Sequence, residues 1–169
     1  TMRRMGKPII ACVEGAAAGA GVSMALAADL VIAAEDAYFT LAYVHIGTSP
    51  DGSASFHLPR AVGIKKAMEI ALLGERFDAA TAEKYGIVNW VVPLDKLAEE
   101  TKSLATRLAD GPTHAIGRTK ALISAAPTRD LETHLQAEGV SFGACSATAE
   151  MAEGVAAFVA KRPAEFKKT

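Results

Sequence analysis

The chain has 169 residues, of which 50% are hydrophobic and 22% are charged, and its formal net charge is -1 at pH 7. This length and apolar content suit one globular domain with a sizeable core. A net charge so near zero, without a polybasic run, argues against nucleic acid and acidic membranes as partners, and no apolar run approaches the ~20 residues of a membrane span.

The first predicted element is an apolar strand at Ile9–Val13, which leads through Glu14 and a run of glycines and alanines at 15–21 into a helical run at Val22–Ala28. This pattern predicts a strand, a tight glycine turn and a helix N-terminus. Small side chains let a ligand oxygen approach the backbone, and the first N–H groups of a helix lack intrahelical partners. The junction is therefore a candidate oxyanion or anion site, with a mere packing turn as the alternative.

Two further strands are predicted at Leu30–Ala33 and Val88–Val92, and helical patterns fill most of the intervals. This alternation indicates an α/β fold. Apolar residues recur at helical spacing along Ile64–Leu73, and Gly74 stands at a position typical of a C-cap. The stripe predicts a core helix.

After Pro93, an amphipathic helix is predicted over Leu94–Leu108, and Gly111 begins a break in the pattern. The remainder predicts three or four helices, punctuated by Pro127, Gly143 and Pro163. We expect a boundary near Gly111, between residues 1–110 and a helical region at 111–169 that serves assembly. The two cysteines, Cys12 and Cys145, lie far apart in the sequence. We expect reduced thiols, a buried Cys12 and a cytoplasmic protein without a signal peptide.

Several separated segments together resemble the crotonase (enoyl-CoA hydratase/isomerase) superfamily, in the family's order: Lys7–Ala11, Ala42–Gly52, Leu58–Gly63, Ala82–Val88 and Glu153–Phe158. The resemblance implies the C-terminal part of a ββα spiral core over 1–110 and a C-terminal helical region over 111–169 that mediates trimerisation and contacts coenzyme A. It implies an enzyme that acts on acyl-CoA or enoyl-CoA thioesters as a homotrimer or a dimer of trimers. Coenzyme A then enters as part of the substrate, and we expect no permanently bound cofactor.

The resemblance covers the C-terminal two-thirds of the usual chain. In the family, the portion before it supplies the first of two oxyanion N–H donors and much of the adenine pocket, and we expect that portion to be absent from this sequence. The second donor falls by motif match on the backbone N–H of Ala20, between Gly19 and Gly21, where the family usually has glycine. Alanine keeps this N–H donor, although its methyl group narrows the allowed conformations.

Hydratases that resemble this chain use two glutamates, whose positions match Ser23 and Tyr43. Neither is a carboxylate, so hydration by two glutamates is disfavoured. We interpret Ser23 as an ordinary first-turn helix residue and Tyr43 as part of the pocket wall.

The sequence instead offers Asp51, between Pro50 and Gly52. The resemblance is to isomerases of the family with aspartate at this position, in which one carboxylate moves a proton between two carbons of an enoyl thioester. It extends to the dehalogenase branch, where this aspartate attacks an aromatic ring and tryptophan replaces Tyr43. The alternative is a structural Asp51 that caps a helix by accepting the N–H of Ser53 or Ala54.

The resemblance also implies that Phe142 and Lys161 contact coenzyme A bound to a neighbouring subunit, whereas a solvated helix end is the alternative for Lys161. We interpret His45 and His57 as structural or solvent-facing. No histidine has metal-ligand spacing, and we expect no metal site. The remaining histidines, His114 and His134, carry no motif.

Two further functions stay open: a divergent hydratase that uses one carboxylate, and a non-catalytic protein on the same fold that binds RNA or another partner. The loss of both hydratase glutamates favours a non-catalytic protein. The acid at Asp51, the glycine turn and the lack of a basic stripe oppose it. Fatty-acid β-oxidation and degradation of an aromatic acid would both suit such an enzyme.

Overall fold

The computed structural model describes residues 2–168, which form two compact units. The sheet unit comprises Met2 and Ile9–Lys102, and the helical unit comprises residues 3–8 and 103–168. No helix in the described part of the chain is long and apolar enough to cross a bilayer. The predicted division into 1–110 and 111–169 is a statement about function, and it stays a prediction.

The sheet unit contains six short strands and four complete helices. In chain order they are β1 (Ile10–Val13), β2 (Ala16–Ala18), α1 (Ala20–Ala27), β3 (Leu30–Ala34), β4 (Tyr38–Thr40), α2 (Ala54–Val62), α3 (Ile64–Leu73), β5 (Phe77–Asp78), α4 (Ala79–Lys84) and β6 (Trp90–Val92). Short 3-10 helices lie at Met2–Arg4 (η1), Tyr43–Ile46 (η2) and Leu94–Lys96 (η3). The predicted strands at Ile9–Val13, Leu30–Ala33 and Val88–Val92 are confirmed as β1, β3 and β6.

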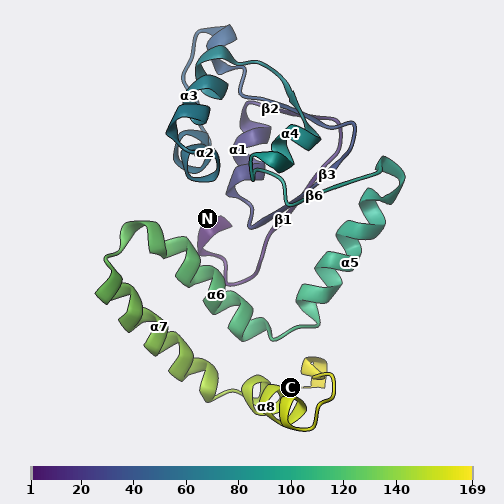
Figure 1. Cartoon of the computed structure of the whole chain (residues 1–169), viewed down its shortest axis with the longest axis vertical. Helices are drawn as coiled ribbons and strands as arrows, with labels where there is room; N and C mark the ends of the chain where they lie inside the picture. Colours follow the sequence, from purple (N-terminus) through teal and green to yellow (C-terminus); the bar gives the residue numbers. More distant parts are fainter. Residues whose placement is uncertain (1, 169) are drawn as a thin grey trace. The chain divides into compact units, whose positions relative to one another are not determined.

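The strands form two three-stranded sheets. β3 lies between β1 and β6 in a parallel sheet (Figure 1), and Ile10 pairs with Leu30 in the β1–β3 register. In the second sheet β4 lies between β2, to which it is parallel, and β5, to which it is antiparallel. Consecutive strands such as β1 and β2 therefore belong to different sheets, and an α-helix follows the pairs β1–β2 and β3–β4, whereas α4 lies between β5 and β6. The chain thus contains two successive ββα units.

β3 is covered on both faces. Val31 and Ala33 belong to the main core, which also holds the largest fully buried side chains of the unit, such as Phe39. Ile32 and Ala34 point to the opposite face, where they pack with Leu97 at the start of α5 (Leu97–Ala109). Burial on both faces explains why this strand reads as a continuous apolar run.

The sequence did not predict β2, β4 or β5. The expected tight turn at 14–21 is wrong in detail, because its three alanines Ala16–Ala18 form β2. Alanine is depleted in strands, so local propensity does not favour this one. It forms because Ala16, Ala17 and Ala18 pair in parallel with β4.

The predicted helix at Ile64–Leu73 is confirmed as α3, and Gly74 ends it in the left-handed conformation at φ 64°. Its role as a core helix is only partly confirmed. Ala67 and Ile70 are buried, whereas three members of the apolar stripe are mainly exposed: Ile64 (69%), Met68 (54%) and Leu72 (64%). The core contacts the helix through Ala67, Ile70 and the partly buried Ala71.

The expectation of a buried Cys12 is wrong. On β1 the side chains alternate, so Val13 faces the main core and Cys12 is exposed. Its sulfur accepts a hydrogen bond of 3.4 Å from the hydroxyl of Thr101 on α5.

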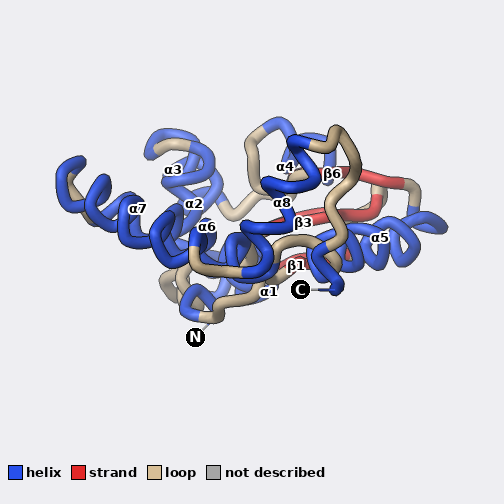
Figure 2. The backbone as a smooth tube through the Cα atoms, turned by 90° about the horizontal axis from the view of Figure 1, so that it is seen from below, coloured by secondary structure: helices blue, strands red, loops and turns tan. Residues whose placement is uncertain are grey.

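The helical unit consists of the end of α5 and three further helices, α6 (Thr113–Ala125), α7 (Leu131–Ser146) and α8 (Ala149–Val159), with 3-10 turns at Ala126–Thr128 (η4) and Phe166–Lys168 (η5). The tube of Figure 2 shows this part as helices joined by short loops. The predicted helix at Leu94–Leu108 is confirmed as η3 followed by α5, although Leu97 is the buried member of its apolar face. Gly143 lies inside α7 and does not interrupt it.

Side-chain caps define the starts of three helices. The carboxylates of Asp78 and Asp130 accept the main-chain N–H groups of Thr81 and Thr133, each at 2.8 Å, and the hydroxyl of Thr148 accepts that of Met151. Hydrogen bonds from Thr81 and Thr133 hold the pKa values of both aspartates below their usual range. These caps fix where α4, α7 and α8 begin.

The N-terminal segment of the helical unit lies directly against α6. A Cβ atom at Gly117 would lie 2.3 Å from the carbonyl oxygen of Gly6, so only glycine permits this backbone approach. One turn further along α6, the buried Lys120 donates a hydrogen bond of 3.0 Å to the carbonyl of Lys7. Residues 3–8 are thus anchored on α6 by main-chain groups.

We predict opposite effects for alanine at two helical glycines of this unit. Gly117→Ala lowers the free energy of unfolding by about 1–3 kcal/mol, because its methyl group overlaps Gly6. Gly139→Ala in α7, where a Cβ meets nothing within 4 Å, raises it by about 0.5–1 kcal/mol. Denaturant unfolding of both variants tests this. Equal effects would mean that Gly6 does not lie against α6 in solution.

Candidate active site

The glycine turn places the start of α1 beside the end of β4. Gly15 and Gly19 adopt positive φ angles of 66° and 51°, which L side chains rarely reach. The N–H of Gly19 donates to the carbonyl of Thr40 at 2.9 Å, which joins the turn to the second sheet. α1 then begins at Ala20, so the N–H of this residue has no acceptor within the helix. The turn therefore provides the kind of donor that we expected at Ala20.

The neighbouring Gly21 is not required by packing. A Cβ atom there would lie 4.0 Å from the Cβ of Ala17, an ordinary van der Waals distance. A Cβ at Gly19 would lie 3.6 Å from the ring of Tyr43, which is also an ordinary van der Waals distance, so the turn lies next to this side chain. Gly19 is favoured by its positive φ of 51° and not by the space around it.

Three residues that lie far apart in the sequence meet beside this turn: Ser23, Tyr43 and Asp51. The phenol of Tyr43 donates to Oδ1 of Asp51 at 2.5 Å. The hydroxyl of Ser23 donates to the main-chain carbonyl of Asp51 at 2.9 Å and lies 3.4 Å from the Tyr43 oxygen. The two positions that match hydratase glutamates therefore both hold the aspartate.

The burial of these three residues differs. Ser23 is fully buried, and Tyr43 is 9% exposed at the start of η2, whereas Asp51 is exposed. The interpretation of Ser23 as an ordinary helix residue is therefore wrong, since it connects α1 to the Asp51 turn. Tyr43 lies beside Asp51 and its hydroxyl binds the candidate base, whereas its role as part of a pocket wall stays a prediction. A carboxylate that is held on one side and open on the other is free to act on a ligand.

The alternative role of Asp51 as a helix cap is wrong. α2 begins at Ala54 after Ser53, and its N-terminus has no side-chain cap. The N–H of Ala54 does reach Asp51, at 3.3 Å, but the acceptor is the main-chain carbonyl. The carboxylate instead faces the phenol of Tyr43.

Gly52 holds the Asp51 turn tightly against α1. It has a φ of 59°, and a Cβ atom there would lie 2.9 Å from the Cβ of Ser23. Real Cβ atoms essentially never come so close. The distance between α1 and the turn is therefore set by the lack of a side chain at Gly52.

The two nearby histidines pack elsewhere in the fold. Nε2 of His45 lies 3.1 Å from the carbonyl oxygen of Gly74, and the ring of His57 packs edge-on against Phe56. These contacts, and the exposure of His45, agree with the structural or solvent-facing role that we expected for both. No cluster of metal-ligating side chains occurs among the described residues.

Phe142 and Lys161 belong to the helical unit. Phe142 is 67% exposed on α7, and Lys161 is exposed directly after α8, where its φ of 52° lies in the left-handed region. Both side chains are thus accessible. Their contact with coenzyme A stays a prediction, as do the roles of Gly19 and Gly21 in ligand binding.

Two hollows lie away from Asp51. One of about 370 Å³ is lined by residues of β1, β2 and α1. The residues that α1 gives it include Gly21, Met24 and Ala25, whose spacing places them on the helix face away from Ser23. The hollow therefore lies on the far side of α1 from the carboxylate.

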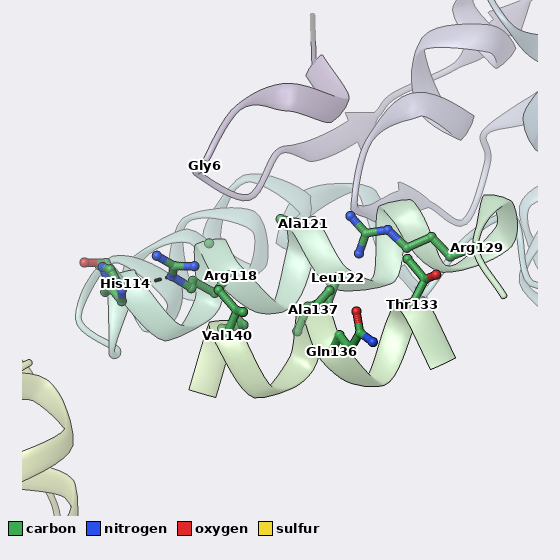
Figure 3. A pocket seen from close by; sticks show the side chains of 13 residues that line it. Gly6, His114, Arg118, Ala121, Leu122, Arg129, Thr133, Gln136, Ala137 and Val140 are labelled. Atoms are coloured by element: carbon green, nitrogen blue, oxygen red, sulfur yellow. Dashed lines mark hydrogen bonds between the residues drawn. The ribbon is translucent and has the colours of Figure 1, made fainter. Parts of the chain in front are cut away.

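The second hollow, of about 670 Å³, belongs to the helical unit and lies between α6 and α7. Figure 3 shows His114 and Arg118 at one end and Arg129 with Thr133 at the other. Nε of Arg118 donates to Nε2 of His114 at 3.2 Å. No carboxylate is among its lining residues, although that of Glu150 accepts hydrogen bonds from Thr113 and from the main-chain N–H of His114.

Comparison with known proteins yields a consistent set of relatives. The family model described as enoyl-CoA hydratase/isomerase matches residues 1–169. A 1,2-epoxyphenylacetyl-CoA isomerase of Escherichia coli K12 is 39% identical over 165 residues, which are 98% of this chain and 63% of the relative. A protein of Rhodobacter capsulatus named as a probable enoyl-CoA hydratase is 40% identical over 159 residues, 94% of this chain and 62% of the relative.

The fold of the solved relatives agrees with this result. The crystal structure of an enoyl-CoA hydratase from Polaromonas sp. JS666 superimposes with a TM-score of 0.93 at 38% identity, covering 97% of this chain and 64% of that one. The predicted crotonase-like α/β fold is confirmed. The chain spans less than two thirds of the length of these relatives.

We predict that alanine at Gly52 is more harmful than alanine at Gly63, which follows α2 with a φ of 77° and open space around its Cβ position. Gly63→Ala lowers the free energy of unfolding by about 1–2 kcal/mol through backbone strain alone. Gly52→Ala adds the overlap with Ser23 and costs about 1–3 kcal/mol more. Chemical denaturation of the two variants measures the difference. Equal losses would contradict the close contact between the turn and α1.

Proposed function

The chain belongs to the enoyl-CoA hydratase/isomerase family, and on that premise we propose that the protein shifts a carbon–carbon double bond in an enoyl-CoA thioester. In this proposal the Asp51 carboxylate moves the proton, and the N–H of Ala20 binds the thioester oxygen. The observation that carries it is the 2.5 Å hydrogen bond from Tyr43 to Asp51, which joins one carboxylate to a residue in a hydratase glutamate position.

The residue types at the site favour isomerisation over hydration. Addition of water needs groups that hold the water and deliver its protons, and two carboxylates serve this purpose in the hydratases that this sequence resembles. Ser23 and Tyr43 replace them here, and both are engaged with Asp51. A single carboxylate is sufficient for isomerisation, because the proton that it removes is the proton that it returns.

The reaction follows from these groups. A carboxylate oxygen of Asp51 takes a proton from C2 of a 3-enoyl thioester, and the electron pair of the broken C–H bond moves onto the thioester oxygen. The Ala20 N–H, at the start of α1, stabilises that negative charge. Asp51 then delivers the proton to C4, and the electrons return to form the C2–C3 double bond. The product is the conjugated 2-enoyl thioester.

Coenzyme A recognition and assembly are further parts of the proposal. Lys161 offers a cation for phosphate, Phe142 offers an aromatic face for adenine, and Gly19 and Gly21 allow close approach of the thioester. The proposed assembly is a homotrimer or a dimer of trimers. Large exposed apolar side chains on α7 and α8 support it: Leu131, Leu135, Val140, Phe142, Val155, Phe158 and Val159.

Hydration is the second candidate, because two of the relatives described above are named as enoyl-CoA hydratases. In that case Asp51 alone would activate the water. The products separate the two reactions, since isomerisation leaves the mass of the thioester unchanged and hydration adds one water.

We predict that Asp51→Asn lowers the rate of conversion of a 3-enoyl-CoA into the 2-enoyl-CoA at least about a hundredfold, because the amide cannot accept the proton. The affinity for a saturated acyl-CoA, measured by calorimetry, changes little. In the proposal the Asp51 carboxylate acts only at C2 and C4 of the acyl chain and does not contact the coenzyme A part. The assay uses the protein as its gene encodes it, and mass spectrometry identifies the product.

Asp36→Asn is the matched control, because Asp36 lies exposed in the turn between β3 and β4. This variant keeps the wild-type rate. Isomerisation retained in Asp51→Asn would exclude Asp51 as the base, and a hydrated product from the wild type would favour the second candidate.

A further inference from the structure

We propose that Tyr43 is a positioning residue, which holds one oxygen of Asp51 so that the other oxygen alone carries the proton between the two carbons. This inference rests on the proposed isomerisation and assigns a task to a side chain that the reaction scheme above does not use.

The hydrogen bond between the two side chains has the geometry of a strong interaction. The Tyr43 oxygen lies 2.5 Å from Oδ1 of Asp51, a length typical of an O–H group that donates to an ionised carboxylate. The Tyr43 ring is 9% exposed and lies at the Gly19 turn, where a Cβ would be 3.6 Å from it. The main-chain carbonyl of Tyr43 also accepts the N–H of Thr48 at 3.1 Å. The position of the phenol is therefore fixed by packing and by a main-chain hydrogen bond.

Ser23 and Tyr43 each have one hydroxyl proton, and each donates it in a hydrogen bond to a different oxygen of Asp51. The single hydroxyl proton of Ser23 goes to the main-chain carbonyl of Asp51, and that of Tyr43 goes to Oδ1. Ser23 thus fixes where the backbone of Asp51 lies, whereas Tyr43 fixes how its carboxylate is turned. Substitution at Tyr43 consequently changes the carboxylate orientation and leaves the Ser23 bond in place.

This orientation matters while Asp51 holds the substrate proton. When the C2–H bond breaks, the proton binds to Oδ2 because Oδ1 is occupied, and the electron pair moves to the thioester oxygen. When the O–H bond breaks, the same proton forms the C4–H bond, and no other reactant is consumed. Rotation of the protonated carboxyl group in between would turn its proton toward water, because Asp51 is exposed. The Tyr43 hydrogen bond opposes that rotation.

The inference predicts a specific isotopic signature in Tyr43→Phe. Loss of a hydrogen bond to a charged group lowers kcat about tenfold, while KM stays within about twofold because substrate contacts are unchanged. In D2O, the fraction of product that carries deuterium at C4 rises at least about twofold during initial turnover, since the loosened carboxyl group exchanges its proton with solvent. A purely structural role for the hydroxyl would not change this fraction.

Tyr38→Phe is the matched control. It removes the same atom from a tyrosine on β4, whose ring packs 4.7 Å from the guanidinium of Arg76. This variant keeps the wild-type kcat and the wild-type deuterium content.

A double-mutant cycle of Tyr43→Phe and Asp51→Ala tests the contact without substrate, because alanine removes the acceptor that asparagine would keep. The effects of the two substitutions on the free energy of unfolding should be non-additive, because the residues are in contact. Additive effects would overturn the inference, as would an unchanged deuterium content in an active Tyr43→Phe enzyme. A wild type that does not isomerise 3-enoyl-CoA would instead overturn the proposed function, and the proton path with it.

Discussion

The burial of β3 on both faces and its pairing on both edges is the constraint on which the rest of the sheet unit depends. β1 and β6 bind its edges, the main core covers one face, and Leu97 with Ile32 and Ala34 covers the other. β1 and β3 each continue into the second sheet, so the β1–β3 register also fixes how β2 meets β4. That pairing brings the Gly19 turn beside Thr40, and the chain reaches Tyr43 three residues later.

Part of this arrangement could be predicted from sequence, because apolar runs mark strands and helices. β1, β3 and β6 lie in such runs, although only β3 is largely buried, and the stripe along Ile64–Leu73 gave the bounds of α3. β2 could not be predicted, since three alanines have no strand preference and only the partner strand β4 organises them. The same limit applies to Cys12, because an apolar strand segment does not show which of its alternating side chains will be covered.

At the candidate site, the resemblance identified the positions of Ser23, Tyr43 and Asp51, but it did not show how they interact. Asp51 lies 28 residues after Ser23, and the bond between them depends on a turn that approaches α1 only because residue 52 is glycine. The local pattern Ser-Pro-Asp-Gly is a turn signature, which is why a helix cap was a reasonable alternative. The structure excludes the cap, since the Asp51 carboxylate accepts a hydrogen bond from the phenol of Tyr43 and none from the first N–H groups of α2.

The contact of Gly52 with Ser23 also bears on how catalysts of this fold diverge. Ser23 is fully buried, and the space beside its Cβ is already occupied by the backbone of the Asp51 turn. A glutamate at position 23 would therefore have to displace that turn, and with it the aspartate. In this chain, a carboxylate at position 23 and the present position of the Asp51 turn therefore exclude each other sterically. A variant with carboxylates at both positions would need changes in the turn as well as in α1.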